Sequence, residues 1–219
     1  MLLGIDLGGT KIEGIVLKSK ENPKEIIRHR INTEEEKGYS QVINNIKSLV
    51  NHIENKINYK FKRLGIGTPG TIDPETGLLK NSNSQCLNGM PIQKDLAKAL
   101  DKIILIQNDA NCFALAETLL GSVKDQYPNA KNVFGIIIGT GVGGGVIIDG
   151  KTVYGNQGIG GEWGHTIVTD NGDDCYCGKR GCVESVISGR ALQIYYTKIS
   201  GKKYSKETSR SLWTKRPLR

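Results

Sequence analysis

Two stretches of this sequence decide its fold, because each is an apolar run that ends in glycines and resumes as a second apolar run. The first is Ile5–Thr10, which reads Ile-Asp-Leu-Gly-Gly-Thr, and the second is Ile138–Gly143, which reads Ile-Gly-Thr-Gly-Val-Gly. Each predicts a β-strand, a glycine turn and a second β-strand. They lie about 130 residues apart, so the sequence predicts a duplicated α/β fold with a ligand between the two halves.

Hydrophobic periodicity predicts the remaining elements and the domain limits. A helical face runs through residues 40–58, and shorter helices are expected at 92–100 and 110–120. Strands are expected at 2–7, 11–18, 24–33, 64–67, 103–107, 133–138 and 145–148. We expect a first lobe at 1–120, a hinge near 121–132, a partial second lobe at 121–204, and a basic tail at 205–219.

The net charge of +8 is unevenly distributed. Residues 198–219 hold eight of the 30 basic residues and one of the 22 acidic residues, which leaves a nearly neutral body. A neutral body gives no support to a nucleic-acid-binding fold. No segment has the run of about 20 apolar residues that spans a bilayer, and the N-terminus has no secretory signal. We expect a cytoplasmic protein with no membrane or nucleic-acid partner.

The first glycine turn carries groups that suit phosphate binding. Asp6 ends an apolar strand and can hold Mg²⁺, while Gly8 and Gly9 expose backbone N–H groups and Thr10 and Lys11 add side-chain donors. The sequence has no G-x-x-x-x-G-K-[ST] motif, which excludes a P-loop. A plain β-hairpin explains the same residues.

The second glycine run, Gly139–Gly145, offers a similar backbone cradle for an anion, with the hydroxyl of Thr140 beside Gly139 and Gly141. Because one such loop stands in each half, the pair favours a nucleotide phosphate site over two unrelated turns.

The stretch Asn108-Asp109-Ala110-Asn111 is a polar cluster between an apolar strand and a helix. An N-cap accounts for one of these residues. A carboxylate at this position, in a fold with two phosphate loops, could accept the proton of an attacking hydroxyl, so Asp109 is the candidate general base.

One histidine and three cysteines, namely His165, Cys175, Cys177 and Cys182, suit a closed tetrahedral Zn²⁺ site of structural type. Reduced free thiols are the alternative. The odd total of five cysteines does not suit a disulfide framework.

Together these residues resemble the ROK family (repressor, open reading frame, kinase), from Leu3 to about Gly189. The most specific stretches are Gly161–His165 and Cys175–Glu184, and Asp6–Lys11 and Asn108–Asn111 also match. The resemblance implies a two-lobed actin-like (ribonuclease H-like) ATPase fold. It further implies ATP-dependent phosphorylation of a hexose at its 6-hydroxyl, with ATP, Mg²⁺ and structural Zn²⁺ as cofactors.

The resemblance also implies a role for each site residue. Asp109 would be the base, and Asn83, Asn108, Glu162, His165 and Glu184 would bind the sugar hydroxyls. His165 would serve zinc through one ring nitrogen and sugar through the other. Asp6, Gly8, Gly9, Thr10 and Lys11, with Gly139, Thr140 and Gly141, would bind the nucleotide and its metal.

Within the family, Lys80–Ser84 and Leu87–Gly89 look most like bacterial fructokinases or mannokinases, with N-acetylglucosamine or glucose kinases as the alternative. ROK repressors carry an N-terminal helix-turn-helix, which the strand at Leu2 excludes here. Family kinases continue well beyond Gly189, so we expect a truncated second lobe. A non-catalytic sugar-binding fragment is therefore the alternative of another class, and a homodimer is allowed.

Overall fold

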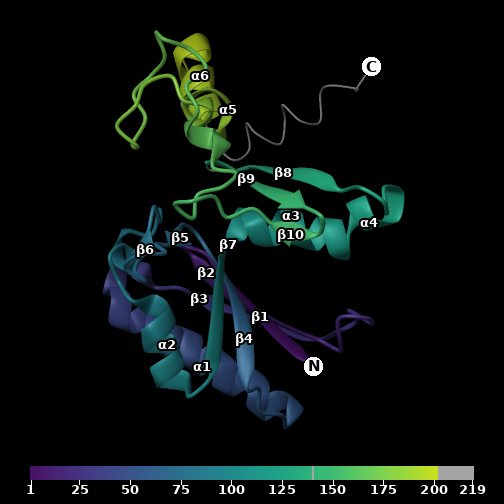
Figure 1. The fold of residues 1–219 in the computed structure, drawn as a ribbon. Coiled ribbons are helices and arrows are strands. Elements are labelled where there is room, and N and C mark those ends of the chain that lie inside the picture. The colour runs from purple at the N-terminus through teal and green to yellow at the C-terminus, as the bar shows by residue number, and fades with distance from the viewer. Residues whose placement is uncertain (140, 202–219) are drawn as a thin grey trace. The chain divides into compact units, whose positions relative to one another are not determined.

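The computed structural model describes residues 1–139 and 141–201, and the chain divides into two compact units. The first unit comprises Met1–Gly135 and Gly145–Gly160, and the second comprises Ile136–Gly144 and the chain from Gly161 onward. Figure 1 shows the order of the elements along the chain. The predicted tail at 205–219 and the predicted phosphate ligand Thr140 lie outside the described residues.

A five-stranded sheet in the order β3-β2-β1-β4-β7 forms the centre of the first unit. Its strands are β1 (Leu2–Leu7), β2 (Lys11–Leu17), β3 (Glu25–Asn32), β4 (Arg63–Thr68) and β7 (Ile103–Asn108). The first three strands run antiparallel, and β1, β4 and β7 run parallel to one another. All five lie where the sequence predicts strands, and with their helices they confirm the α/β class.

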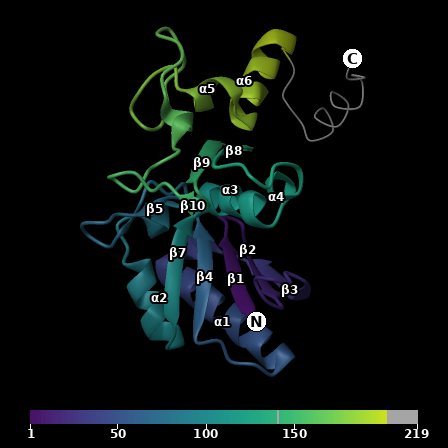
Figure 2. The same ribbon diagram turned by 45° about the vertical axis from the view of Figure 1, so that its right-hand side comes forward.

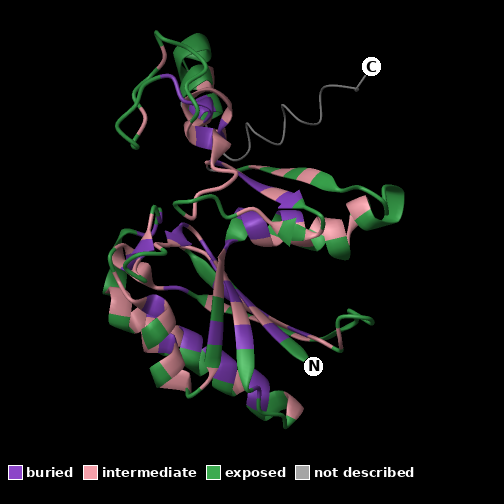
Figure 3. Cartoon of the chain, viewed as in Figure 1, coloured by how far each residue is buried: buried purple, intermediate pink, exposed green. Residues whose placement is uncertain are grey.

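Two helices, α1 (Tyr39–Ile57) and α2 (Ile92–Leu100), cover one face of this sheet (Figures 1 and 2). The apolar residues of α1 recur at helical spacing, and Ile46 and Ile53 are fully buried. Contact with the sheet is close: a Cβ at Gly14 would lie 2.5 Å from Cδ1 of Ile53. Figure 3 shows the buried positions along α1 and the central strands. The periodicity therefore predicts both helices correctly.

The chain then forms α3 (Asp109–Leu119), α4 (Ser122–Gln126) and a three-stranded sheet, β10-β9-β8. Its strands are β8 (Asn132–Ile138), β9 (Val142–Ile148) and β10 (Lys151–Thr152). Glycines let this sheet approach α3: a Cβ at Gly135 would lie 2.6 Å from Cβ of Ala114, and one at Gly145 would lie 2.9 Å from it.

This packing moves the domain boundary away from the predicted one. Residues 121–135 and 145–160 group with the first unit, whereas the sequence predicts a second lobe from residue 121. The physical reason is that α3 holds the start of β8 and the end of β9 against it. The segment expected to be a hinge contains α4.

The second unit contains helices for which the sequence analysis makes no prediction. They are the short 3₁₀ helix η3 (Trp163–His165), α5 (Val183–Ile187) and α6 (Gly189–Ser200). Ser188 begins α6, since its Oγ accepts a hydrogen bond from the N–H of Ala191 at 3.1 Å. Two-residue strands β5 (Thr71–Ile72) and β6 (Leu79–Lys80) and 3₁₀ helices η1 (Glu35–Lys37) and η2 (Gln85–Leu87) complete the first unit.

Among the described helices, none combines the length and the apolar composition that a bilayer span requires.

Candidate functional site

The parallel strands of the first unit bring the predicted acidic residues to one edge of the sheet. Asp6 of β1 is in register with Gly67 of β4, and Gly67 is in register with Gln107 of β7. Asn108 ends β7 and Asp109 begins α3. Ligands of open α/β sheets bind at such carboxyl-terminal edges. The register alone therefore places Asp6 and the Asn108–Asp109 pair at the end of the sheet where a substrate can be bound.

Asn108 has a structural role that the sequence offered as an alternative. It caps α3, because its Oδ1 accepts a hydrogen bond from the N–H of Asn111 at 3.1 Å. Its Nδ2 donates to the carbonyl oxygen of Gly70 at 3.1 Å, and only 6% of the residue is exposed. Asn108 thus links the start of α3 to the turn after β4. A ligand that binds the Asn108 side chain must share Oδ1 or Nδ2 with these hydrogen bonds.

The carboxyl groups of Asp109 and Asp6 have raised pKa values. For Asp109, burial of the carboxyl group is the main cause, and the charge of Asp6 adds to it. A hydrogen bond from the N–H of Ala110 to Asp109 Oδ1, 2.8 Å long, opposes the shift. The pKa of Asp6 is raised first by burial and then by Glu13. A raised pKa suits a group that must exchange protons.

The turn between β1 and β2 is held by a residue that the sequence analysis did not single out. The N–H of Gly8 donates to the carbonyl of Lys11 at 3.0 Å, which closes the turn. Thr33, 1% exposed, donates from its Oγ1 to the carbonyl of Gly8 at 2.6 Å and from its N–H to the carbonyl of Thr10 at 3.0 Å. A threonine just after a strand gives no signal in the sequence for this role.

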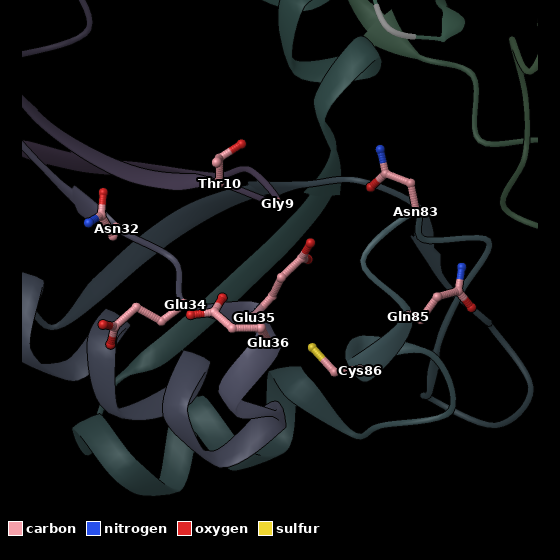
Figure 4. Close-up of a pocket in the computed structure, with 9 residues that line it drawn as sticks. All are labelled: Gly9, Thr10, Asn32, Glu34, Glu35, Glu36, Asn83, Gln85 and Cys86. Carbon is pink, nitrogen blue, oxygen red and sulfur yellow. The ribbon is translucent and has the colours of Figure 1, made fainter. Parts of the chain in front are cut away.

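An open cavity of about 650 Å³ lies beside this turn (Figure 4). Its lining residues are Gly9, Thr10, Asn32, Glu34, Glu35, Glu36, Asn83, Gln85 and Cys86. Asn83, a predicted sugar ligand, thus shares a cavity with the predicted phosphate ligands Gly9 and Thr10, and Asn108 and Asp109 do not line it. Lys11 is exposed and does not line the cavity either.

The second glycine loop is shorter than the sequence predicts. The strand β9 begins at Val142, so the run from Gly143 to Gly145 belongs to the sheet. The N–H of Gly139 donates to the carbonyl of Gly141 at 2.9 Å. The N–H of Val142 donates to Oε2 of Glu184 at 2.9 Å. The second half of the expected cradle therefore lies in β9, where a Cβ at Gly145 would lie 2.8 Å from the carbonyl oxygen of Ala110 in α3.

The second unit brings together the predicted metal ligands. One ligand atom from each of His165, Cys175, Cys177 and Cys182 lies within 4.8 Å of all the others. The Sγ atoms of Cys177 and Cys182 are 3.7 Å apart, and Sγ of Cys175 is 3.5 Å from Nδ1 of His165. A tetrahedral zinc site separates two sulfurs by about 3.8 Å and a sulfur from a nitrogen by about 3.5 Å. These residues fit Zn²⁺, which would hold the loop between η3 and α5.

The remaining predicted sugar ligands of this unit flank the cysteine cluster. Glu162 precedes η3, and Glu184 lies in the first turn of α5, two residues after Cys182. The Nε2 of His165, expected to face a sugar, lies 3.1 Å from the hydroxyl of Tyr176. Tyr176 is a neighbour that the sequence analysis missed, although it stands inside the Cys-x-Cys stretch.

Comparison with known proteins places these residues in one family. Residues 2–214 match the ROK family. An N-acetyl-D-glucosamine kinase of Aliivibrio salmonicida is 36% identical over 211 residues, which cover 92% of this chain and 67% of that protein. A glucokinase of Thermotoga maritima is 36% identical over 194 residues, covering 88% of this chain and 58% of that protein.

Solved structures agree with the sequence relatives. The ROK hexokinase from Thermus thermophilus matches with a TM-score of 0.81 at 30% identity, covering 99% of this chain and 70% of that one. A ROK family glucokinase from Streptomyces griseus, in complex with glucose and AMPPNP, matches with a TM-score of 0.74 at 28% identity, covering 91% of this chain and 61% of that one. The chain spans about two thirds of the length of these proteins, and it belongs to the ROK family.

Proposed function

We propose that this chain is an ATP-dependent sugar kinase that transfers a phosphoryl group to a hexose hydroxyl. The observation that carries the proposal is Asp109, a carboxyl group of raised pKa at the carboxyl-terminal edge of the parallel strands, one residue after a buried helix cap. In this role Asp109 accepts the proton of the attacking hydroxyl. Phosphoryl transfer otherwise depends on positioning and on neutralising phosphate charge.

The nucleotide side of the proposal uses both glycine turns. The backbone N–H groups of Gly9 and Thr10 bind phosphate oxygens, and the segment from Gly139 to Gly141 contributes from the second turn. Asp6 holds Mg²⁺, which supplies charge neutralisation to the phosphates when it is bound. Support for this assignment is that Asp6 is the penultimate residue of β1, the strand that leads into the first turn.

The sugar side assigns hydroxyl binding to Asn108 in the first unit and to Glu162, His165 and Glu184 in the second. Zinc, when bound by His165 and the three cysteines, fixes the segment that carries these second-unit residues. Asn83 stays a weaker assignment, since its cavity contains the first glycine turn and not Asp109.

For the preferred hexose we propose N-acetylglucosamine or glucose. The sequence motifs favoured fructose or mannose, but the relatives at 36% identity are named N-acetyl-D-glucosamine kinase and glucokinase. The two alternatives differ at the substituent on carbon 2 of the sugar, and a pocket that accepts an acetamido group need not reject a hydroxyl.

A coupled assay of ADP release with N-acetylglucosamine, glucose, fructose and mannose tests the proposal. Turnover with one of the first two at the highest kcat/KM supports it, and highest turnover with fructose or mannose reverses the substrate assignment. Calorimetry with the same sugars and a non-hydrolysable ATP analogue addresses the second candidate, a sugar-binding fragment. Because the chain spans 67% of its kinase relative, hexose binding without nucleotide binding or turnover would establish that second candidate.

A further inference from the structure

The second glycine loop and the predicted sugar ligand Glu184 are in direct contact within the second unit. Glu184 Oε2 accepts the 2.9 Å hydrogen bond from the N–H of Val142 described above. A Cβ built on Gly141 would lie 2.6 Å from the same oxygen and 3.3 Å from Cδ of Glu184. Such a separation is too short for any real Cβ contact, so a side chain at residue 141 would displace the carboxylate of Glu184.

The two flanks of this contact are held by other parts of the same unit. On one side, the N–H of Gly189, at the start of α6, donates to the carbonyl of Gly139 at 2.8 Å. On the other side, Nε1 of Trp163 donates to the carbonyl of Gly143 at 2.9 Å. Since both flanks are fixed, a shift of the loop at residues 141–142 acts directly on the carboxylate of Glu184.

The carboxylate of Glu184 has the capacity to accept a hydrogen bond from a second partner. An ionised carboxylate accepts several hydrogen bonds through its two oxygens, and the hydrogen bond from Val142 goes to Oε2. Cys182, which is fully buried and belongs to the cysteine cluster, occupies the N-cap position of α5, two residues before Glu184. One carboxylate therefore stands between the glycine loop and the segment that carries the cysteine cluster.

We propose that Glu184 is a positioning residue that couples the two substrates: its carboxylate binds the glycine loop through Val142 and a sugar hydroxyl at the same time. The inference rests on the proposed function, in which Glu184 binds the hexose and residues 139–141 bind phosphate. A change in the loop that displaces the carboxylate then weakens sugar binding, although in this proposal the loop itself does not touch the sugar. By linkage, phosphate on the loop and hexose on Glu184 change each other's affinity by the same factor.

Two alanine substitutions test the coupling by hexose calorimetry on the full chain. Gly141→Ala puts a methyl group against Glu184, and Gly65→Ala, in β4 of the first unit, puts one into open space, with no atom within 4 Å. We expect Gly141→Ala to raise the Kd for N-acetylglucosamine or glucose about 10-fold, within the usual range of coupling between sites. Gly65→Ala should leave the Kd for the sugar within about 2-fold. Thermal unfolding of both variants shows whether either has simply lost its fold.

A second measurement needs no substitution. In the ¹⁵N-labelled parent chain, adding hexose should shift the backbone amide resonance of Val142, because the carboxylate that accepts its hydrogen bond gains a second partner. Equal sugar affinity for Gly141→Ala and Gly65→Ala, or an unmoved Val142 resonance in a chain that binds sugar, overturns the coupling and leaves the kinase proposal standing. A parent chain that binds none of the hexoses contradicts the kinase proposal, and the coupling with it.

Discussion

The glycine turn between β1 and β2 and the glycine loop between β8 and β9 have the same sequence pattern but different supports. The first is held by Thr33, from the end of the neighbouring strand β3. The second is held by Glu184 and Gly189, more than 40 residues further along the chain. Similar turns can thus depend either on the sheet that contains them or on a distant segment.

This difference has a consequence for stability. Thr33 is 1% exposed and directly follows β3, so its contacts should form whenever the sheet of the first unit forms. Glu184 stands two residues from Cys182, in the segment that zinc would hold if the cysteine cluster binds it. The first turn should therefore keep its geometry without metal, and the second should lose it.

The largest expected effect is on the chemistry assigned to the first unit. Asp109→Asn should lower kcat by about 10²–10⁴-fold, as removal of a general base does, with little change in hexose Kd. The raised pKa of Asp109 also sets the pH dependence: turnover should fall as pH drops through that raised value, because the base must be deprotonated. Steady-state kinetics against pH measure both, with Asp125→Asn, an exposed carboxylate of α4, as the control.

Asp109→Asn, which should lower kcat, should not lower the stability of the fold. A carboxyl group whose pKa is raised by folding makes its full contribution to stability below its unfolded-state pKa, and this contribution is lost as pH rises through the folded-state pKa. Asp109→Asn should therefore unfold at an equal or higher temperature than the parent at neutral pH. Near-normal kcat, or a clearly lower unfolding temperature, would contradict the assignment of Asp109.

A second substitution tests whether the two turns depend differently on metal. Cys177→Ser should lose stoichiometric zinc and weaken hexose binding about 10-fold or more, because His165 and Glu184 flank the loop that the metal holds. Amide exchange at Val142 should become faster, while exchange at Gly8 should not change. Elemental analysis and hydrogen exchange measure these effects, and Cys86→Ser, a cysteine outside the cluster, should keep its zinc. A parent chain without zinc would end the metal interpretation.

The third substitution acts on the first turn alone. Thr33→Val removes the hydroxyl that binds the carbonyl of Gly8 and should lower the free energy of unfolding by about 1–3 kcal/mol, the cost of an unsatisfied buried acceptor. Exchange at Gly8 and Thr10 should speed up, with no change at Val142. Thr33→Ser keeps the hydroxyl and should cost less in denaturant unfolding. If Thr33→Val disturbed both turns equally, they would not be independently supported.

The fold could be predicted from the sequence where short-range pattern decides it. The period of residues 40–58 gives α1, and the apolar runs give the strands of the first sheet within about a residue. The boundary predicted at 121 differs from the division into units because Gly135 and Gly145 permit close packing on Ala114. That packing joins residues distant in sequence, and no local signal reveals it.

The candidate site shows the same limit. The cysteine spacing predicts the cluster, since few other roles suit three cysteines and a histidine so close together. Thr33, which holds the first turn, and Tyr176, which contacts His165, were missed because a hydroxyl gives no sign of its hydrogen-bond partner until the chain is folded. Glu184 was found through the family resemblance, but its bond to Val142 was not.

The smallest expected effect compares the space beside the two turns. A Cβ at Gly9 would lie 3.2 Å from Oγ of Ser84 and 3.4 Å from Oε2 of Glu35, which a few tenths of an ångström of side-chain movement relieves. Gly9 has no left-handed φ, so alanine also gains about 0.4–1 kcal/mol by restricting the unfolded chain. These terms oppose each other, and Gly9→Ala should change the free energy of unfolding by less than about 0.5 kcal/mol. Denaturant unfolding measures this change, with Gly65→Ala as the control because no atom lies within 4 Å of a Cβ at that position. A loss above about 2 kcal/mol would mean that the first turn is as tightly enclosed as Gly141.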